Sequence, residues 1–141
     1  MERAATVTRI EHVGIAVRNL ESAIGIYEKL LGVRCSSVEE VRDQHVRTAF
    51  FRLGDSKVEL LESTSPDGPI ARFIAKRGEG IHHIAYAVGD VRAALRDLGS
   101  LGVRLIDGEP RTGAEGLSIA FVHPDSACGV LTEFTESPRT P

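Results

Sequence analysis

The chain has 141 residues, of which 42% are hydrophobic and 26% charged, and its formal net charge is −3. The length fits one domain of ordinary size, and this composition excludes an intrinsically disordered chain. A nearly neutral chain offers no broad positive surface to nucleic acid, and no apolar run reaches the roughly 18 residues of a membrane span. The N-terminus also lacks the apolar stretch of a signal peptide. We therefore expect a cytoplasmic protein with neither a nucleic-acid nor a membrane partner.

The first predicted strand recurs 71 positions later in the chain, as the distance from His12 to His83 shows. Residues 11–17 (EHVGIAV) align with residues 82–88 (HHIAYAV), and Asn19 and Asp90 follow at the same offset. Both of these residue types cap helices, because their side-chain oxygens accept the free N–H groups of the first turn. The repeat indicates two copies of one structural unit.

A helix is predicted after each of these caps. Apolar residues recur at i, i+3, i+4 and i+7 over about 20–31 and 91–101, a spacing typical of amphipathic helices that lie on a core. Gly32 and Gly102 follow, and glycine suits the left-handed turn that ends a helix. Three strands are then predicted in each copy, over about 34–41, 45–53 and 56–62, and over about 104–107, 117–123 and 129–135.

These elements predict an α+β fold built from two tandem βαβββ modules. We expect a single domain over residues 1–141, with a first module over about 8–64 and a second over about 80–136. A linking helix is predicted between them, over about 68–78.

Strand parity places polar side chains on one face of the predicted sheet, since alternate residues of a strand point to opposite faces. His12 shares its face with Gly14 and Ala16, while valine and isoleucine side chains occupy the other face. His83 likewise shares its face with two alanines. Small residues leave space above a sheet, as a concave binding site requires.

The last strand of each module adds an acid to this face. Glu59 alternates with two apolar residues that are expected in the core. In the final strand Val130 and Phe134 are predicted to face the core and Glu133 the site. Taken singly, each histidine could be a hydrogen-bonded structural residue and each glutamate a solvated one. The agreement of all four favours a site for a borderline divalent metal, because imidazole and carboxylate are suitable ligands for such ions.

The chain resembles the methylmalonyl-CoA epimerase family of the vicinal oxygen chelate superfamily from about Ile10 to Glu136. The matching segments are residues 11–17, VELLE over 58–62, GVLTE over 129–133 and, most specifically, GEGIHHIA over 78–85. The resemblance implies that the two modules form one curved mixed sheet around a metal site. It implies one divalent metal ion there, with cobalt the first choice and zinc, nickel and manganese as alternatives, and it implies a homodimer. The ligands that it implies are His12, Glu59, His83 and Glu133.

The resemblance also implies the reaction, a metal-dependent interconversion of (2R)- and (2S)-methylmalonyl-CoA. This acyl-CoA substrate would lose its α-proton to form a metal-stabilised enolate. Well-described members have a glutamate where this chain has Thr48, so we predict Glu59 and Glu133 as the two proton carriers. Gln44 and Thr48 are predicted to contact the substrate, and His45, where many members have glycine, is predicted to face the solvent. Two alternatives stay open: another metal-dependent enzyme of the superfamily, such as a glyoxalase-type isomerase or lyase, and a non-catalytic ligand-binding protein.

Overall fold

The structure is a computed structural model that describes residues 6–136. The described residues divide into two compact units: one spans His12–His82, and the other joins residues 6–11 to residues 83–136. Among the described helices, none is long and apolar enough to cross a membrane.

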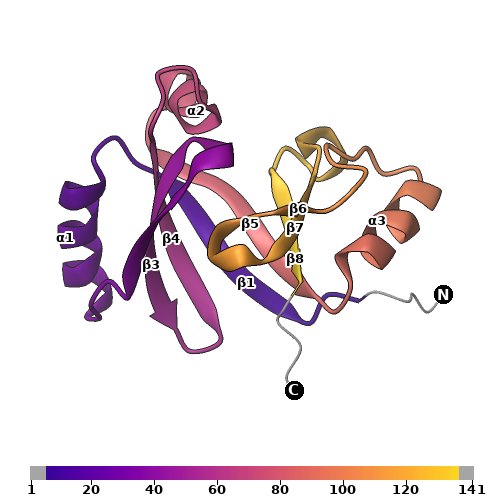
Figure 1. Cartoon of the computed structure of the whole chain (residues 1–141), viewed down its shortest axis with the longest axis horizontal. Coiled ribbons are helices and arrows are strands. Elements are labelled where there is room, and N and C mark those ends of the chain that lie inside the picture. The colour runs from indigo at the N-terminus through magenta and orange to yellow at the C-terminus, as the bar shows by residue number, and fades with distance from the viewer. Residues whose placement is uncertain (1–5, 137–141) are drawn as a thin grey trace. The chain divides into compact units, whose positions relative to one another are not determined.

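The unit His12–His82 contains a mixed sheet with the strand order β2-β3-β4-β1 (Figure 1). Strand β1 is parallel to β4, and the other neighbouring pairs are antiparallel. Helices α1 and α2 both contact β4. The bounds are β1 Arg9–Ala16, α1 Leu20–Leu31, β2 Ser37–Val41, η1 Arg42–Gln44, β3 Val46–Leu53, β4 Ser56–Ser63 and α2 Pro69–Arg77.

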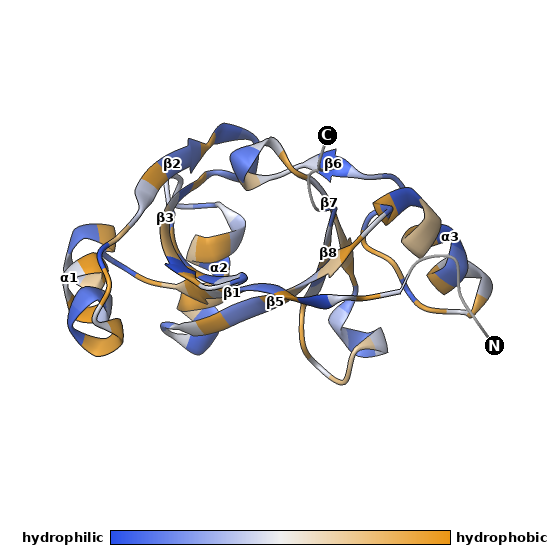
Figure 2. Ribbon diagram, turned by 90° about the horizontal axis from the view of Figure 1, so that it is seen from below, coloured by the Kyte–Doolittle hydropathy of each residue, from blue (hydrophilic) through white to orange (hydrophobic). Residues whose placement is uncertain are grey.

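Helix α1 covers one face of this sheet, as its amphipathic sequence predicted. Bands of hydrophobic and hydrophilic residues alternate along its ribbon in Figure 2. Ile15 and Val58 are partly buried against the cluster beneath it, so the predicted packed face is confirmed. That cluster consists of Val17, Leu20, Ala23, Ala49, Phe51 and Leu60. A smaller cluster includes Ile70 of α2 and draws Ala16 and Leu61 from the strands.

The second unit contains a sheet of the same kind, with the order β5-β8-β7-β6 and with β5 parallel to β8. Helix α3 packs on it over a buried cluster that includes Val91, Leu95 and Phe134. The bounds are β5 Gly80–Val88, α3 Val91–Ser100, β6 Arg111–Thr112, η2 Ala114–Gly116, β7 Ser118–Val122, η3 Pro124–Ser126 and β8 Thr132–Glu136. The two βαβββ units with mixed strand pairing confirm the predicted α+β class.

Strands β1 and β5 each begin in one compact unit and end in the other. The N–H of Thr8, just before β1, donates to the carbonyl of Ala87 at 3.0 Å. The N–H of Arg18, just after β1, donates to the carboxylate of Glu79 at 2.8 Å. Each unit therefore includes a short piece of chain from the other sequence module, which the repeat did not predict.

The register of the parallel strands is the same in both units. Glu59 of β4 lies opposite Gly14 of β1, and Glu133 of β8 lies opposite Ala85 of β5. Each of these small residues comes two positions after a histidine of its strand, so the two glutamates occupy equivalent places.

The strand predicted over residues 104–107 is wrong. Leu105 makes only an isolated bridge with Val122, and the N–H groups of Ile106 and Asp107 both donate to the carbonyl of Phe121. The Asp107 carboxylate in turn accepts the Phe121 N–H at 2.8 Å, and this side-chain bond takes the place of a ladder bond. Regular pairing resumes in β6, after Pro110, which has no N–H to donate.

The prediction for Val130 is also wrong, because this side chain is 40% exposed instead of facing the core. Cys128 and Gly129 have positive φ angles of 56° and 89°, so the chain turns sharply just before Val130. Strand β8 begins only at Thr132, and alternation cannot assign a face to a residue that lies outside the strand.

A second glutamate, three residues after each site glutamate, caps a helix in each unit. The N–H of Leu20 donates to Glu62 at 2.8 Å, and the N–H of Val91 donates to Glu136 at 3.0 Å. Because three positions is an odd offset in a strand, Glu59 and Glu62 point to opposite faces of the sheet. The sequence E-x-x-E thus supplies one carboxylate to the site and one to a helix N-terminus, which favours negative charge.

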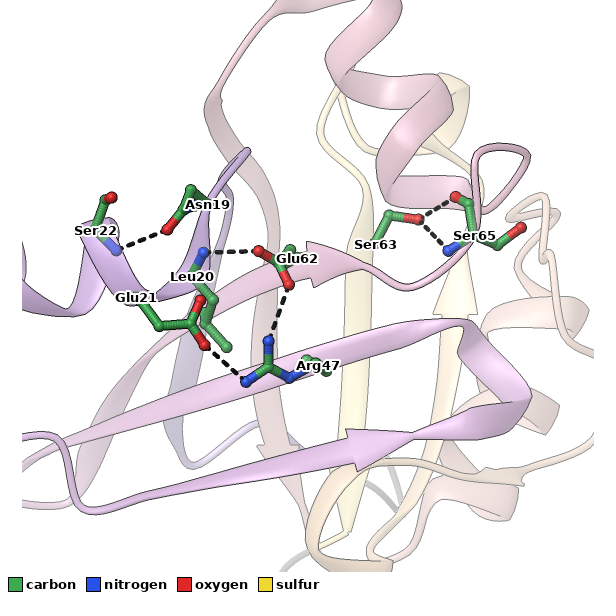
Figure 3. A network of polar contacts seen from close by, with 8 residues as sticks. All are labelled: Asn19, Leu20, Glu21, Ser22, Arg47, Glu62, Ser63 and Ser65. Atoms are coloured by element: carbon green, nitrogen blue, oxygen red, sulfur yellow. Dashed lines mark hydrogen bonds and ion pairs between the residues drawn. The ribbon is translucent and has the colours of Figure 1, made fainter.

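The predicted caps are confirmed beside these glutamates. The Asn19 side chain accepts the Ser22 N–H at 2.9 Å, and the Asp90 side chain accepts the Ala93 N–H at 3.0 Å. Around the first cap, Arg47 of β3 bridges Glu62 and Glu21, as Figure 3 shows together with the Ser63–Ser65 turn after β4.

Candidate metal and substrate site

In the unit His12–His82, a histidine and a glutamate lie side by side on the face of the sheet opposite the one that packs against α1. His12 Nδ1 lies 3.2 Å from Glu59 Oε2. The two residues are 5% and 3% exposed, so both are withdrawn from water. Gly14 lies opposite Glu59 in the register, and its lack of a side chain leaves room for the carboxylate beside the imidazole.

The second unit repeats this arrangement. His83 Nε2 lies 3.4 Å from Glu133 Oε1, and the residues are 5% and 4% exposed. The hydroxyl of Thr135 donates to the other oxygen of Glu133 at 2.5 Å. The ring of Phe121 meets the His83 imidazole edge to face, with centroids 5.8 Å apart. Thr135 and Phe121 therefore fix the orientations of Glu133 and His83, and metal ligands in proteins are commonly oriented by such neighbours.

These donor groups fit a divalent metal ion. His12 and Glu59 fall, with the buried Glu11, in one cluster of side chains whose ligand atoms lie within 4.8 Å of one another, and His83 and Glu133 also fall in such a cluster. Imidazole and carboxylate suit cobalt, nickel, zinc and manganese, and a buried carboxylate needs a cation or several hydrogen-bond donors. None of the four is a cysteine, which disfavours a closed structural zinc site.

Lys57 is a residue of this face that the sequence analysis missed. Its ammonium lies 3.4 Å from Glu59 Oε2 and 5.4 Å from the centroid of the Phe50 ring, and the residue is only 7% exposed. Lys57 also lies directly opposite His12 in the register of β1 and β4. The available signal was parity, because a residue two positions before Glu59 shares its face.

Of the two predicted substrate contacts, Gln44 lies just before β3 and Thr48 lies within it. Thr48 is 1% exposed and two positions from Phe50, the residue opposite Glu59, so it shares the face of Glu59. Gln44 ends η1, and its Nε2 is buried and, among the described residues, has no hydrogen-bond partner.

Two further histidines have different surroundings. His82 meets Phe73 of α2 edge to face at 5.0 Å between centroids, and burial lowers the pKa of its imidazole to about 4. His45 is exposed, as predicted, and follows η1 with a left-handed φ of 53°. Glycine adopts this conformation without strain, which is the physical reason to expect glycine there.

Comparison with known proteins places these residues in a wider group. Residues 11–121 match the family model described as the glyoxalase/bleomycin resistance protein/dioxygenase superfamily. The mitochondrial methylmalonyl-CoA epimerase of Homo sapiens is 37% identical over 130 residues, which are 92% of this chain and 74% of that protein. The ethylmalonyl-CoA/methylmalonyl-CoA epimerase of Cereibacter sphaeroides is 38% identical over 132 residues, covering 92% of this chain and 98% of that protein.

Solved structures agree with this comparison. A methylmalonyl-CoA epimerase in complex with methylmalonyl-CoA and NH4+ superposes with a TM-score of 0.92 at 38% identity, over 96% of this chain and all of that one (100%). The methylmalonyl-CoA epimerase of Mycobacterium tuberculosis gives a TM-score of 0.91 at 37% identity, over 99% of this chain and 94% of that one.

Proposed function

Because the chain belongs to the glyoxalase/bleomycin resistance protein/dioxygenase superfamily and, within it, to the methylmalonyl-CoA epimerase family, we propose that it interconverts (2R)- and (2S)-methylmalonyl-CoA. The observation that carries the proposal is the repeated buried pair, His12 with Glu59 and His83 with Glu133, at equivalent positions of two modules. A non-catalytic binding protein has no need of two such pairs in its interior.

We propose further that the two pairs supply four ligands to one divalent metal ion, with cobalt as the first candidate and zinc, nickel and manganese as alternatives. The burial and chemistry of the four side chains support this assignment. When bound, the ion would act as a Lewis acid that polarises the carboxylate and thioester oxygens of the substrate.

The chain's own contribution to the reaction is proton transfer at C2 of the substrate. Inversion requires one group that removes the proton from one face and another that returns a proton to the opposite face. We assign these roles to Glu133 and Glu59, since the threonine hydroxyl at position 48 is a poor base at neutral pH. The Thr135 hydroxyl orients Glu133 through one oxygen.

Gln44 and Thr48 are proposed to contact the substrate. The buried Gln44 amide nitrogen has two N–H groups to donate and no acceptor among the described residues. A bound carboxylate or thioester oxygen would satisfy it, and leaving such a donor unpaired costs about 1–3 kcal/mol.

The test is solvent exchange at C2. The cobalt-loaded protein is incubated with (2S)-methylmalonyl-CoA in deuterated water and followed by mass spectrometry and NMR. We expect deuterium at C2, appearance of the (2R) epimer and no loss of thioester. A lyase or glyoxalase-type enzyme would convert the compound to another product, and a binding protein would leave the rate equal to that of a chelator-treated control. Ethylmalonyl-CoA run in parallel reports the substrate preference.

The number of metal ions bound per chain tests whether the two His–Glu pairs bind one ion together. We expect one metal ion per chain, with loss of that ion from both the His12→Ala and the His83→Ala variants. Two separate sites would instead give two ions, of which each variant would keep one.

The homodimer implied by the resemblance is also proposed for this protein. Light scattering on the eluted peak of a size-exclusion column is expected to give twice the 15.2 kDa chain mass. A mass equal to that of one chain would contradict it.

A further inference from the structure

We propose that Lys57 sets the charge of the metal site by holding Glu59 in a buried ion pair, so that this carboxylate contributes to metal binding with part of its negative charge offset by the ammonium. The inference rests on the proposed metal site and adds a residue to it. In this proposal Lys57 is a positioning residue, because it acts on the metal only through Glu59.

The geometry places two nitrogen atoms beside one carboxylate oxygen. Glu59 Oε2 lies 3.4 Å from the Lys57 ammonium and 3.2 Å from His12 Nδ1. These three side chains come from two adjacent strands, and the register places His12 directly opposite Lys57. The orientation of the Glu59 carboxylate is thus determined by both neighbours.

The burial of Lys57 is the unusual feature. Lysine normally extends its four-carbon stem so that the ammonium reaches water, and desolvating a charged ammonium is costly unless an opposite charge lies nearby. Here the side chain is only 8% exposed, while that of Glu59 is 4% exposed. The Phe50 ring, 5.4 Å from the ammonium, adds a favourable cation–π contact.

The equivalent glutamate of the other unit has a different partner. Glu133 accepts a hydrogen bond from the neutral hydroxyl of Thr135. A hydroxyl orients a carboxylate without cancelling its charge, whereas an ammonium cancels it. The Lys57–Glu59 contact thus places a formal positive charge beside one site glutamate, and the Thr135–Glu133 contact places a neutral donor beside the other.

If Lys57 acts through its charge, removing it changes the affinity for a divalent cation in a direction that a purely packing role would not predict. Removing Lys57 adds one net negative charge beside the proposed ion, so a divalent cation binds more tightly. Removing the Glu59 charge while Lys57 remains leaves a net positive charge, so the cation binds more weakly. Removing both charges restores the net charge that the wild-type protein has at this place. For charges a few ångströms apart in a protein interior, each single change is worth about tenfold or more in affinity.

The experiment measures Co(II) dissociation constants by competition with a chromogenic chelator. The variants are Lys57→Met, Glu59→Gln and the Lys57→Met/Glu59→Gln double variant. We expect Lys57→Met to bind Co(II) at least about tenfold more tightly than the wild type and Glu59→Gln at least about tenfold more weakly. The double variant is expected to bind Co(II) more tightly than Glu59→Gln and more weakly than Lys57→Met, because the two charge changes cancel while the amide is a weaker ligand than the carboxylate. Lys29→Met, the same substitution at an exposed lysine of α1, is the matched control and leaves the affinity unchanged.

Urea unfolding of the metal-free variants gives a second readout. Lys57→Met removes the ammonium beside the buried Glu59 carboxylate and is therefore expected to lower the urea concentration at the midpoint of unfolding. The Lys57→Met/Glu59→Gln double variant is expected to recover most of this decrease, because the buried carboxylate is then absent as well. If Lys57→Met does not fold, Lys57→Arg keeps the charge at the same place and is expected to keep the wild-type affinity within about threefold.

The result that overturns the inference is a Lys57→Met affinity equal to or weaker than that of the wild type, or a Lys57→Arg affinity changed as much as that of Glu59→Gln. A wild-type protein that binds no Co(II) would instead overturn the proposed metal site itself. The wild-type measurement thus separates the two failures.

Discussion

His45 is a non-glycine residue in a backbone conformation that glycine adopts most easily. Its φ of 53° lies in the left-handed region, where a side chain with a Cβ is strained by about 1–2 kcal/mol. Its N–H still donates to the Arg42 carbonyl and its carbonyl accepts the Thr64 N–H, so the turn forms with the backbone bonds intact.

Replacing His45 by glycine is therefore expected to stabilise the protein. The relief of strain exceeds the extra entropy that glycine gains in the unfolded chain, and we expect a net gain of up to about 1 kcal/mol in the free energy of unfolding. Urea denaturation measures it. His45→Ala keeps the Cβ and is the control, and an equal gain in both variants would contradict the strain argument.

Thr135 is the second residue whose effect can be isolated. Thr135→Val keeps the shape of a side chain that is 1% exposed and removes only the hydroxyl that donates to Glu133. Because this bond has a charged acceptor, its loss is expected to cost about 1–3 kcal/mol of stability. The rate of deuterium incorporation at C2 should also fall, since Glu133 loses its fixed orientation. An unchanged rate in the folded variant would argue against this role of Thr135.

At the scale of elements, the helix that follows the first strand of each module depends on a strand residue far away in sequence. The first-turn N–H groups of α1 and α3 donate to Glu62 and Glu136, beside the local caps Asn19 and Asp90. Each unit therefore attaches its helix to the last strand of its own sheet through a hydrogen bond as well as through the core.

We expect Glu136→Ala to lower the free energy of unfolding by about 1 kcal/mol, the usual value of a helix cap. Glu62→Ala should cost more, because Glu62 is also 3.2 Å from the Arg47 guanidinium. Chemical denaturation compares the two. Glu109→Ala, which removes an exposed partner of Arg92, is expected to change little and serves as the control. Equal losses in all three variants would contradict the capping argument.

At the scale of the whole molecule, the burial of His82 is expected to lower the free energy of unfolding in acid. Its folded-state pKa of about 4 lies below the 6.5 of an ordinary histidine, so protons bind preferentially to the unfolded chain between these values. Above pH 6.5 the effect is absent, and stability falls as the pH drops from 6.5 toward 4. A shift of this size corresponds to about 3 kcal/mol.

His82→Phe removes this part of the pH dependence and keeps an aromatic ring beside Phe73. The metal-free variant is expected to lose less stability than the metal-free wild type when the pH is lowered from 6.5 to 4. Unfolding free energies at several pH values in the presence of a chelator measure the difference. Parallel curves for the two proteins would show that His82 is not responsible.

Much of the fold and part of the candidate site follow from local patterns. The 3.6-residue period predicted α1 and α3, the two-residue period predicted the packed face of β1 and β4, and Asn19 and Asp90 marked the helix starts. The same alternation put His12 and Glu59 on one face, where the structure holds them 3.2 Å apart. What these residues bind stays a prediction.

The sequence by itself determined the repeated modules, their helix caps and the faces of their strands, because these depend on residues a few positions apart. Only the tertiary structure decided that Lys57 is buried against Glu59, that Glu62 and Glu136 cap helices, and that Asp107 interrupts a strand. These outcomes depend on strand register and on side chains brought together from distant parts of the chain. Parity shows which face a lysine occupies, but only its neighbours across the sheet decide whether its charge reaches water.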